Sequence, residues 1–300
     1  MKILQEDKGF TGVPKVNFFL VGAPKCGTTA MAYYLSKHPN ICMSLPKEPF
    51  FFCNDFENLR DRIGIRTLDD YHSCFSHYNQ ENHLVLGEAS VWYLYSKVAI
   101  SNLLEYNPEA KILVMVRNPV TMIHSLHSMR VGLGHEPEEN LGRAFALEKQ
   151  RESDPGMQLR MYSKIGMLGE QLQNLYSLVP ERQVKVIVYD DFRLNSPQAT
   201  FEILDFLGLD SSLLNDLKFD RLNSQKVVHS KLFLSIYKNQ ALRKVASFVK
   251  EAMRIKSLGI GIAKLPISMQ DKRRMIDIFS EDVELLSSLL NRDLRYWLEL

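Results

Sequence analysis

A glycine-bounded turn near the N-terminus carries residue types that bind phosphate. In the stretch VGAPKCGTTA, Gly22 and Gly27 let the backbone approach a ligand closely, and Thr28 and Thr29 offer hydroxyl donors. The phosphate loop of an ATPase has its lysine directly after the second glycine. Here a threonine stands in that place, and the lysine of the turn, Lys25, precedes Gly27. The pattern therefore predicts an anion site that does not suit a Mg²⁺-bound triphosphate.

A second candidate phosphate contact lies at the end of the apolar run KILVMVR. Arg117 ends this run, and Ser125 follows about two helical turns later. Open α/β sheets bind ligands at the carboxyl ends of their strands, and a guanidinium together with a hydroxyl can hold a phosphate. An arginine that ends a strand is also commonly a solvated charge, so both interpretations stay open.

Apolar runs and helical patterns alternate around these residues, and they must position them. Buried strands are predicted over 17–23, 111–117 and 184–189. Helices are predicted over 27–38, 118–130, 142–151, 166–178 and 196–208, and the last part of the chain is mostly helical. This alternation predicts an α/β fold with a mainly parallel central sheet flanked by helices. Since no repeat or linker interrupts it, we expect a single domain over residues 1–300.

Composition and charge exclude several classes of protein. A formal net charge of +2 with 45% hydrophobic residues is ordinary for a globular protein and argues against a nucleic-acid partner. No run approaches the roughly 18 apolar residues of a transmembrane helix, and the start MKILQEDKGF has no signal-peptide pattern. The four cysteines lack zinc spacing and are expected to be reduced thiols. We therefore expect a cytoplasmic protein without a metal; a homodimer is left open.

The two phosphate-binding segments together resemble a known family. PKCGTTA followed at a distance by RNPVTMIHS is similar to the two cofactor segments of sulfotransferases that use 3′-phosphoadenosine 5′-phosphosulfate (PAPS). The likeness continues through LSKHPNI, KEPFFF, GEASVWYLYS, GMLGEQL, VKVIVYDDF and LLNRDLRYWL, and it is nearest to bacterial enzymes related to the heparan-sulfate sulfotransferases. The resemblance implies a P-loop-like sulfotransferase fold with a helical C-terminal part. It also implies PAPS as sulfuryl donor, adenosine 3′,5′-bisphosphate (PAP) as product, and a metal-independent reaction.

The resemblance also implies which residues bind the donor. The first loop would bind the 5′-phosphate through Lys25, Cys26, Gly27, Thr28, Thr29 and Ala30. Arg117 and Ser125 would clamp the 3′-phosphate, and Lys25 would neutralise the charge that develops on the leaving phosphate. Later segments that approach the nucleotide in relatives contribute Lys164, Gly166, Asn223, Ser224 and Lys231.

A general base must take the proton of the acceptor. Glu48 in KEPFFF matches the position of a catalytic glutamate in the heparan-type relatives, and the following run of phenylalanines is expected to desolvate it. Alternatively, Glu48 only pairs with Lys47 at the surface. His124 and His127 are rival bases beside Ser125, although structural histidines are commoner.

The chain departs from the relatives at Met122, Ala89 and Leu168, where arginine, lysine and tyrosine are usual. The aromatic residues of KEPFFF and VWYLY either line an acceptor pocket or pack in the core. We expect a transferase that acts on a hydroxyl or amine of a small molecule such as a secondary metabolite. The alternatives are a carbohydrate or glycolipid acceptor, a catalytically silent nucleotide-binding protein, and a P-loop kinase or NTPase.

Overall fold

The computed structural model describes residues 12–214, 217, 219 and 264–300. The chain divides into two compact units. The first contains Met1–Asn118, Met167–Asp220 and Asp282–Arg295, and the second contains Pro119–Gly166, Arg221–Glu281 and Tyr296–Leu300. The expectation of a single domain stays a prediction.

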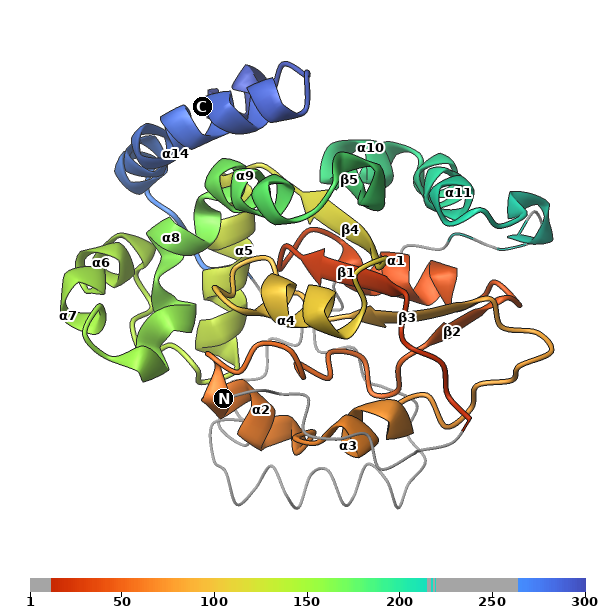
Figure 1. The fold of residues 1–300 in the computed structure, drawn as a ribbon. Helices are drawn as coiled ribbons and strands as arrows, with labels where there is room; N and C mark the ends of the chain where they lie inside the picture. The colour runs from red at the N-terminus through yellow and green to blue at the C-terminus, as the bar shows by residue number, and fades with distance from the viewer. Residues whose placement is uncertain (1–11, 215–216, 218, 220–263) are drawn as a thin grey trace, which may run out of the picture. The chain divides into compact units, whose positions relative to one another are not determined.

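A five-stranded parallel sheet forms the centre of the first unit (Figure 1). Its order is β2-β3-β1-β4-β5, with β1 at Phe18–Gly22, β2 at Ile41–Met43, β3 at Val85–Ala89, β4 at Lys111–Val116 and β5 at Val184–Val188. Every residue of the central strand β1 is buried, as expected for a strand whose two faces are covered. The predicted mainly parallel sheet is confirmed, and three of its strands were foreseen as apolar runs.

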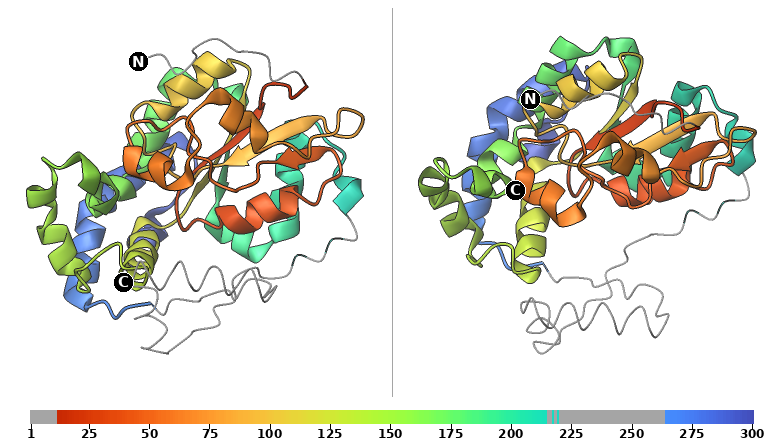
Figure 2. Two further views of the ribbon diagram at one scale, coloured as in Figure 1. Left: turned by 90° about the horizontal axis from the view of Figure 1, so that it is seen from below. Right: turned by 60° about the horizontal axis from the view of Figure 1, so that its bottom comes forward.

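Helices cover both faces of this sheet. The connection from β1 to β2 contains α1 (Thr28–Leu35), whereas the connections that run the other way along the sheet contain α4 (Ala99–Tyr106) and α9 (Leu168–Leu178). Right-handed crossovers therefore put α1 on one face and the other two on the opposite face. Consistently, α4 contacts α9, and α1 contacts α11 (Ser196–Leu207); both pairs lie side by side in Figure 2.

The remaining short elements of the first unit connect these layers. They are α2 (Glu57–Ile63), α3 (Leu68–Ser73), α10 (Tyr189–Leu194) and the 3₁₀ turns Glu181–Gln183 and Ser211–Leu214. The last part of α14 (Met269–Leu289) also belongs here, where Asp282 accepts hydrogen bonds from the backbone N–H groups of Gly169 and Glu170, both at 2.8 Å. This carboxylate thereby caps the start of α9.

The second unit is helical in its described part. It contains α5 (Pro119–Gly132), α6 (Leu141–Ala146), α7 (Glu148–Arg151), the 3₁₀ turn Pro155–Arg160, α8 (Tyr162–Gly166) and the first part of α14. The helical stretch predicted over 142–151 is confirmed, but a turn at Leu147 divides it into α6 and α7. The buried Glu136 accepts two hydrogen bonds from Arg151, at 2.9 and 3.0 Å, and one from the hydroxyl of Tyr162 at 3.0 Å. These bonds link the loop before α6, which carries Glu136, to α7 and α8.

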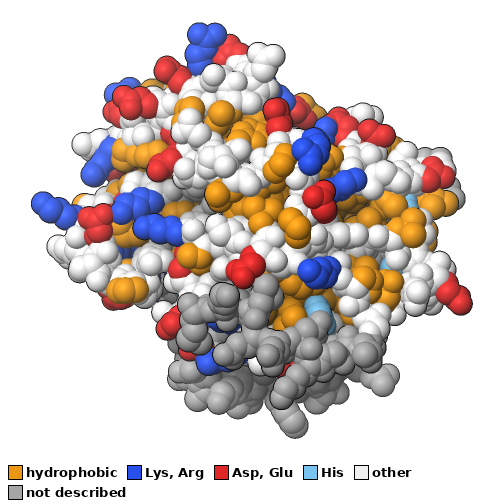
Figure 3. Space-filling view, in the orientation of Figure 1, with side chains coloured by type: hydrophobic (Ala, Val, Ile, Leu, Met, Phe, Trp, Pro, Cys, Tyr) orange, Lys and Arg blue, Asp and Glu red, His pale blue; other side chains and the backbone are white. Residues whose placement is uncertain are grey.

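Charges of both signs are interspersed on the face seen in Figure 3, where basic side chains alternate with acidic ones. No helix within the described residues is both long and apolar enough to cross a membrane.

Candidate functional site

The turn after β1 leaves backbone N–H groups available at the start of α1. Gly27 is the N-cap of this helix, with φ 88°, and no side chain caps the helix. Within the described residues, the N–H groups of Thr28 and Thr29 have no backbone acceptor. Lys25 also has a positive φ, 65°, which is rare for a residue other than glycine. Free N–H groups and the positive end of a helix dipole together suit an anion.

The glycine at position 27 is required by two features of the turn. Its left-handed conformation is one that side chains rarely adopt. In addition, a Cβ there would meet the ring of Phe192 at 3.0 Å and that of Tyr189 at 3.2 Å. The backbone of the turn therefore packs so closely against α10 that no side chain fits at position 27.

Arg117 joins the end of β4 to this turn. Its Nη1 donates a hydrogen bond to the carbonyl oxygen of Lys25 at 2.9 Å, and its guanidinium lies over the ring of Tyr189, 4.5 Å from the centroid. The two predicted phosphate contacts of the first unit, Lys25 and Arg117, are thus brought together at the carboxyl ends of neighbouring strands. Sequence reasoning missed the role of Tyr189, although this residue ends a predicted strand.

The other residues of the turn differ in exposure. Thr28 is buried, Thr29 is exposed and Ala30 is buried. Cys26 is fully buried, and burial raises the pKa of its thiol to about 12, against smaller opposing effects of Arg117 and Lys25. The thiol therefore stays protonated at neutral pH, and only its backbone is available to an anion.

The remaining predicted nucleotide contacts lie in the second unit or outside the described residues. Ser125 lies on α5 and is half-buried, so its pairing with Arg117 stays a prediction. Lys164 forms an exposed ion pair with Glu152, at 2.6 Å. A Cβ at Gly166 would meet the ring of Phe279 at 2.3 Å, so this glycine also has a packing role. Asn223, Ser224 and Lys231 lie outside the described residues.

Glu48 lies in a loop of unusual backbone conformation. Both Glu48 and Phe50 have positive φ values, 66° and 53°. The carboxylate of Glu48 pairs with Nζ of Lys47 at 2.5 Å, and the two side chains are 31% and 28% exposed. The predicted surface pairing is therefore present, and it leaves the carboxylate partly accessible. Its role as base stays a prediction.

The aromatic run after Glu48 belongs to the core. Phe51 and Phe52 are fully buried, and Phe51 stacks on Tyr71 with the centroids 4.8 Å apart. Tyr93 is also fully buried and Trp92 nearly so. Of the two interpretations of these residues, core packing is the one the structure supports.

Two histidines considered as rival bases make structural hydrogen bonds. Nε2 of His124 lies 2.6 Å from the carbonyl oxygen of Leu265, and Nε2 of His127 lies 2.8 Å from that of Glu138. Because a carbonyl only accepts, Nε2 carries the proton in both rings. Burial lowers the pKa of both histidines. These contacts favour structural roles.

The three departures from the family pattern are buried. Met122 and Ala89 are 0% exposed and Leu168 is 1% exposed. At each of these positions a small or apolar side chain packs in the core.

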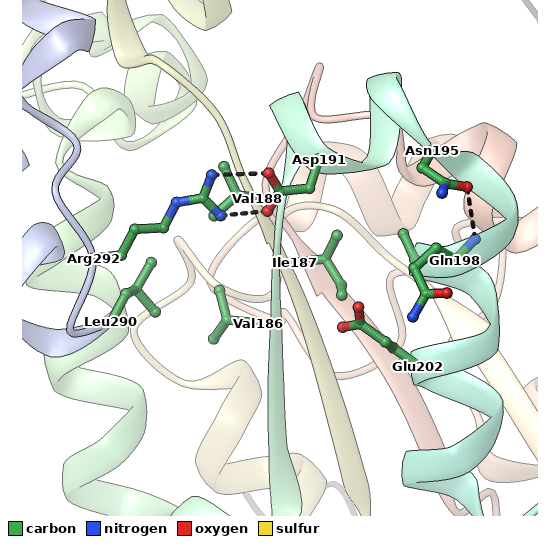
Figure 4. A pocket seen from close by; sticks show the side chains of 10 residues that line it. Val186, Ile187, Val188, Asp191, Asn195, Gln198, Glu202, Leu290 and Arg292 are labelled. Carbon is green, nitrogen blue, oxygen red and sulfur yellow. Dashed lines mark hydrogen bonds and ion pairs between the residues drawn. The ribbon is translucent and has the colours of Figure 1, made fainter.

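A separate cavity of about 280 Å³ lies along β5 in the first unit (Figure 4). It is lined by Val186, Val188 and residues of α10 and α11, and the ion pair between Arg292 and Asp191 borders it. None of the predicted site residues that the structure describes lines it. No cluster of histidine, cysteine and acidic side chains in the described part of the chain could hold a metal ion.

Comparisons with known proteins bear on the family and the fold. The family model described as "Sulfotransferase domain" matches residues 15–252. A crystal structure of a sulfotransferase from Alicyclobacillus acidocaldarius superposes with a TM-score of 0.71 and 26% identity, covering 95% of this chain and 99% of that one.

Two curated relatives match smaller parts of this chain. The membrane-associated sulfotransferase kil1 of Dictyostelium discoideum is 33% identical over 35% of this chain. The bifunctional heparan sulfate N-deacetylase/N-sulfotransferase 2 of Bos taurus is 26% identical over 73% of it. The matches span only 21% and 25% of the lengths of these relatives. Because the family model covers most of the chain, the protein belongs to the sulfotransferase family, transferases that take a sulfuryl group from PAPS and release PAP.

Proposed function

We propose that this chain transfers the sulfuryl group of PAPS to a hydroxyl or amine of a small-molecule acceptor. The observation that carries the proposal is the hydrogen bond between Arg117 and the carbonyl oxygen of Lys25, which joins the two predicted phosphate contacts. The uncapped start of α1 and the positive φ of Gly27 fit an anionic ligand at the same turn.

Each residue has a defined task in this proposal. When bound, PAPS supplies a sulfuryl group on a phosphate leaving group. Lys25 stabilises the negative charge that develops on that phosphate, and Arg117 with Ser125 orients the nucleotide. Glu48 removes the proton from the acceptor oxygen while that oxygen forms its bond to sulfur. As in phosphoryl transfer, positioning and charge stabilisation do most of the work.

A carbohydrate or glycolipid acceptor is the second candidate. Carbohydrate sulfotransferase 15 of Rattus norvegicus, 26% identical over 36% of this chain, favours it, as does the heparan sulfate relative. We keep the small molecule as the first proposal. We also propose the cytoplasm as its compartment, because the four cysteines are buried and form no disulfide.

Two experiments test the proposal. Thermal unfolding with PAP in the absence of metal should give a larger shift than ATP with Mg²⁺; the reverse preference would support a kinase or NTPase. A screen with sulfur-labelled PAPS against phenols, alcohols, amines and oligosaccharides should then yield a labelled product. PAP binding without turnover on any acceptor would instead support a silent nucleotide-binding protein.

A further inference from the structure

A buried carboxyl group lies beneath the loop that carries Glu48. Glu88 is 0% exposed and stands near the carboxyl end of β3, paired in register with Phe19 of β1. Burial raises the pKa of Glu88 to about 8, although hydrogen bonds from Tyr93 and Ser90 oppose the shift. A polar group is buried at a considerable free-energy cost, so its hydrogen-bond partners indicate what it does.

Two buried hydroxyl groups beside Glu88 hold the loop. Oγ of Ser90 lies 3.4 Å from Oε2 of Glu88 and accepts a hydrogen bond from the backbone N–H of Phe50 at 3.2 Å. The hydroxyl of Tyr93 accepts the N–H of Phe52, also at 3.2 Å, and its interaction with the same carboxyl group lowers the pKa of Glu88. Since the hydroxyl of Ser90 donates to Glu88, its lone pairs face the loop.

These bonds act on a strained segment. Glu48 and Phe50 have left-handed backbone conformations, φ 66° and 53°, which non-glycine residues keep only where surrounding contacts impose them. The N–H groups of Phe50 and Phe52 follow Glu48 closely in the chain. Their anchoring therefore determines where the carboxylate of Glu48 is presented.

We propose that Glu88 is a positioning residue, which holds the loop of the catalytic base in place through the hydroxyl groups of Ser90 and Tyr93. The inference rests on the proposed function, in which Glu48 takes the acceptor proton. Glu88 itself touches neither donor nor acceptor and acts only through the hydroxyl groups.

The chain offers a matched control for the loss of one hydroxyl. Tyr71→Phe removes a fully buried hydroxyl from the same aromatic cluster, and this hydroxyl has no hydrogen-bond partner among the described residues. Tyr93→Phe and Glu88→Gln should lower kcat about tenfold, while Tyr71→Phe keeps it within about twofold. PAP affinity should change less than about twofold in all of them. Unchanged kcat in both Tyr93→Phe and Glu88→Gln would overturn the proposal.

A double variant separates positioning from general destabilisation. If Tyr93 acts through Glu48, adding Tyr93→Phe to Glu48→Gln should lower kcat no further, because the base is already absent. A purely structural effect would multiply with that of Glu48→Gln, and this result would contradict the inference. Ser90→Ala replaces Glu88→Gln if the latter does not fold.

Hydrogen exchange tests the same contacts without any turnover. The amide protons of the segment 48–52 should exchange faster in Tyr93→Phe and Glu88→Gln than in wild type, and at the wild-type rate in Tyr71→Phe. Equal exchange in all variants would refute the anchoring role, even if wild type sulfates an acceptor. Absence of both PAP binding and turnover in wild type would instead refute the proposed function.

Discussion

Arg117 donates a hydrogen bond to the carbonyl oxygen of Lys25, 92 residues earlier in the chain, over 2.9 Å. The contact joins the end of β4 to the turn after β1, and the ring of Tyr189 supports the guanidinium from one side. One side chain thus both shapes the loop and presents charge beside it.

Removal of Arg117 should weaken cofactor binding. Arg117→Ala should reduce the free energy of PAP binding by about 2–4 kcal/mol, because a charge-assisted contact to a phosphate is lost. Arg182→Ala is the control, since this exposed arginine lies at the opposite, amino end of β5. Isothermal titration measures both. Equal PAP affinity of wild type and Arg117→Ala would mean that the 3′-phosphate binds elsewhere.

Gly27→Ala should destabilise the protein and weaken PAP binding. A side chain in this left-handed conformation costs about 1–2 kcal/mol, and its Cβ would also meet Phe192 at 3.0 Å. Gly208→Ala is the matched control, because Gly208 has φ +78° but nothing within 4 Å of its Cβ position. Urea unfolding should show a larger loss for Gly27→Ala. Equal losses of stability in the two variants would show that the backbone conformation alone accounts for the effect of Gly27→Ala.

Glu48→Gln should lower turnover by roughly 10²–10⁴-fold, because the amide keeps the shape but accepts no proton. PAP affinity should stay nearly unchanged. Steady-state kinetics with an alcohol or phenol acceptor measures kcat, since an amine would add its own ionisation to the pH profile. If more than about a third of the wild-type turnover remains, the base lies elsewhere.

Lys25→Ala should lower both turnover and PAP affinity, because Lys25 contacts the ligand itself in the proposed mechanism. This combination distinguishes it from Glu48→Gln, which should affect kcat alone. Titration with PAP and single-turnover measurements give the two quantities separately. Unaltered PAP binding in Lys25→Ala would argue against its contact with the leaving phosphate.

Because of Glu88, the free energy of unfolding should fall as the pH rises. In the unfolded chain this carboxyl loses its proton near its ordinary pKa of 4.5, but in the native protein burial raises the pKa to about 8. Between these values the native state binds more protons, so this group lowers the free energy of unfolding by up to about 1.4 kcal/mol per pH unit.

Comparison with Glu88→Gln isolates this effect. The amide stays neutral, so the variant should lose less stability than wild type between about pH 5 and about pH 8. Urea unfolding at several pH values compares the two slopes. Parallel curves would show that the native carboxyl is ionised at neutral pH.

Local sequence was sufficient for much of the fold. β1, β4 and β5 were predicted because each is an apolar run bounded by a turn or a helix start, a signal that neighbouring residues carry by themselves. β2 and β3 were missed, since ICM is only three residues long and VLGEA contains a glycine and an acid. Those strands form because neighbours in the sheet supply their hydrogen bonds.

The sequence by itself determined the residue types of the phosphate turn, the position of Lys25 just after one predicted strand and that of Arg117 at the end of another. Only the tertiary structure decided that these two residues touch. It also decided that His124 binds a backbone carbonyl and that Glu88 reaches the loop of Glu48 through Ser90. Sequence periodicity reports neighbours within a few residues, whereas these partners are brought together only when the chain packs.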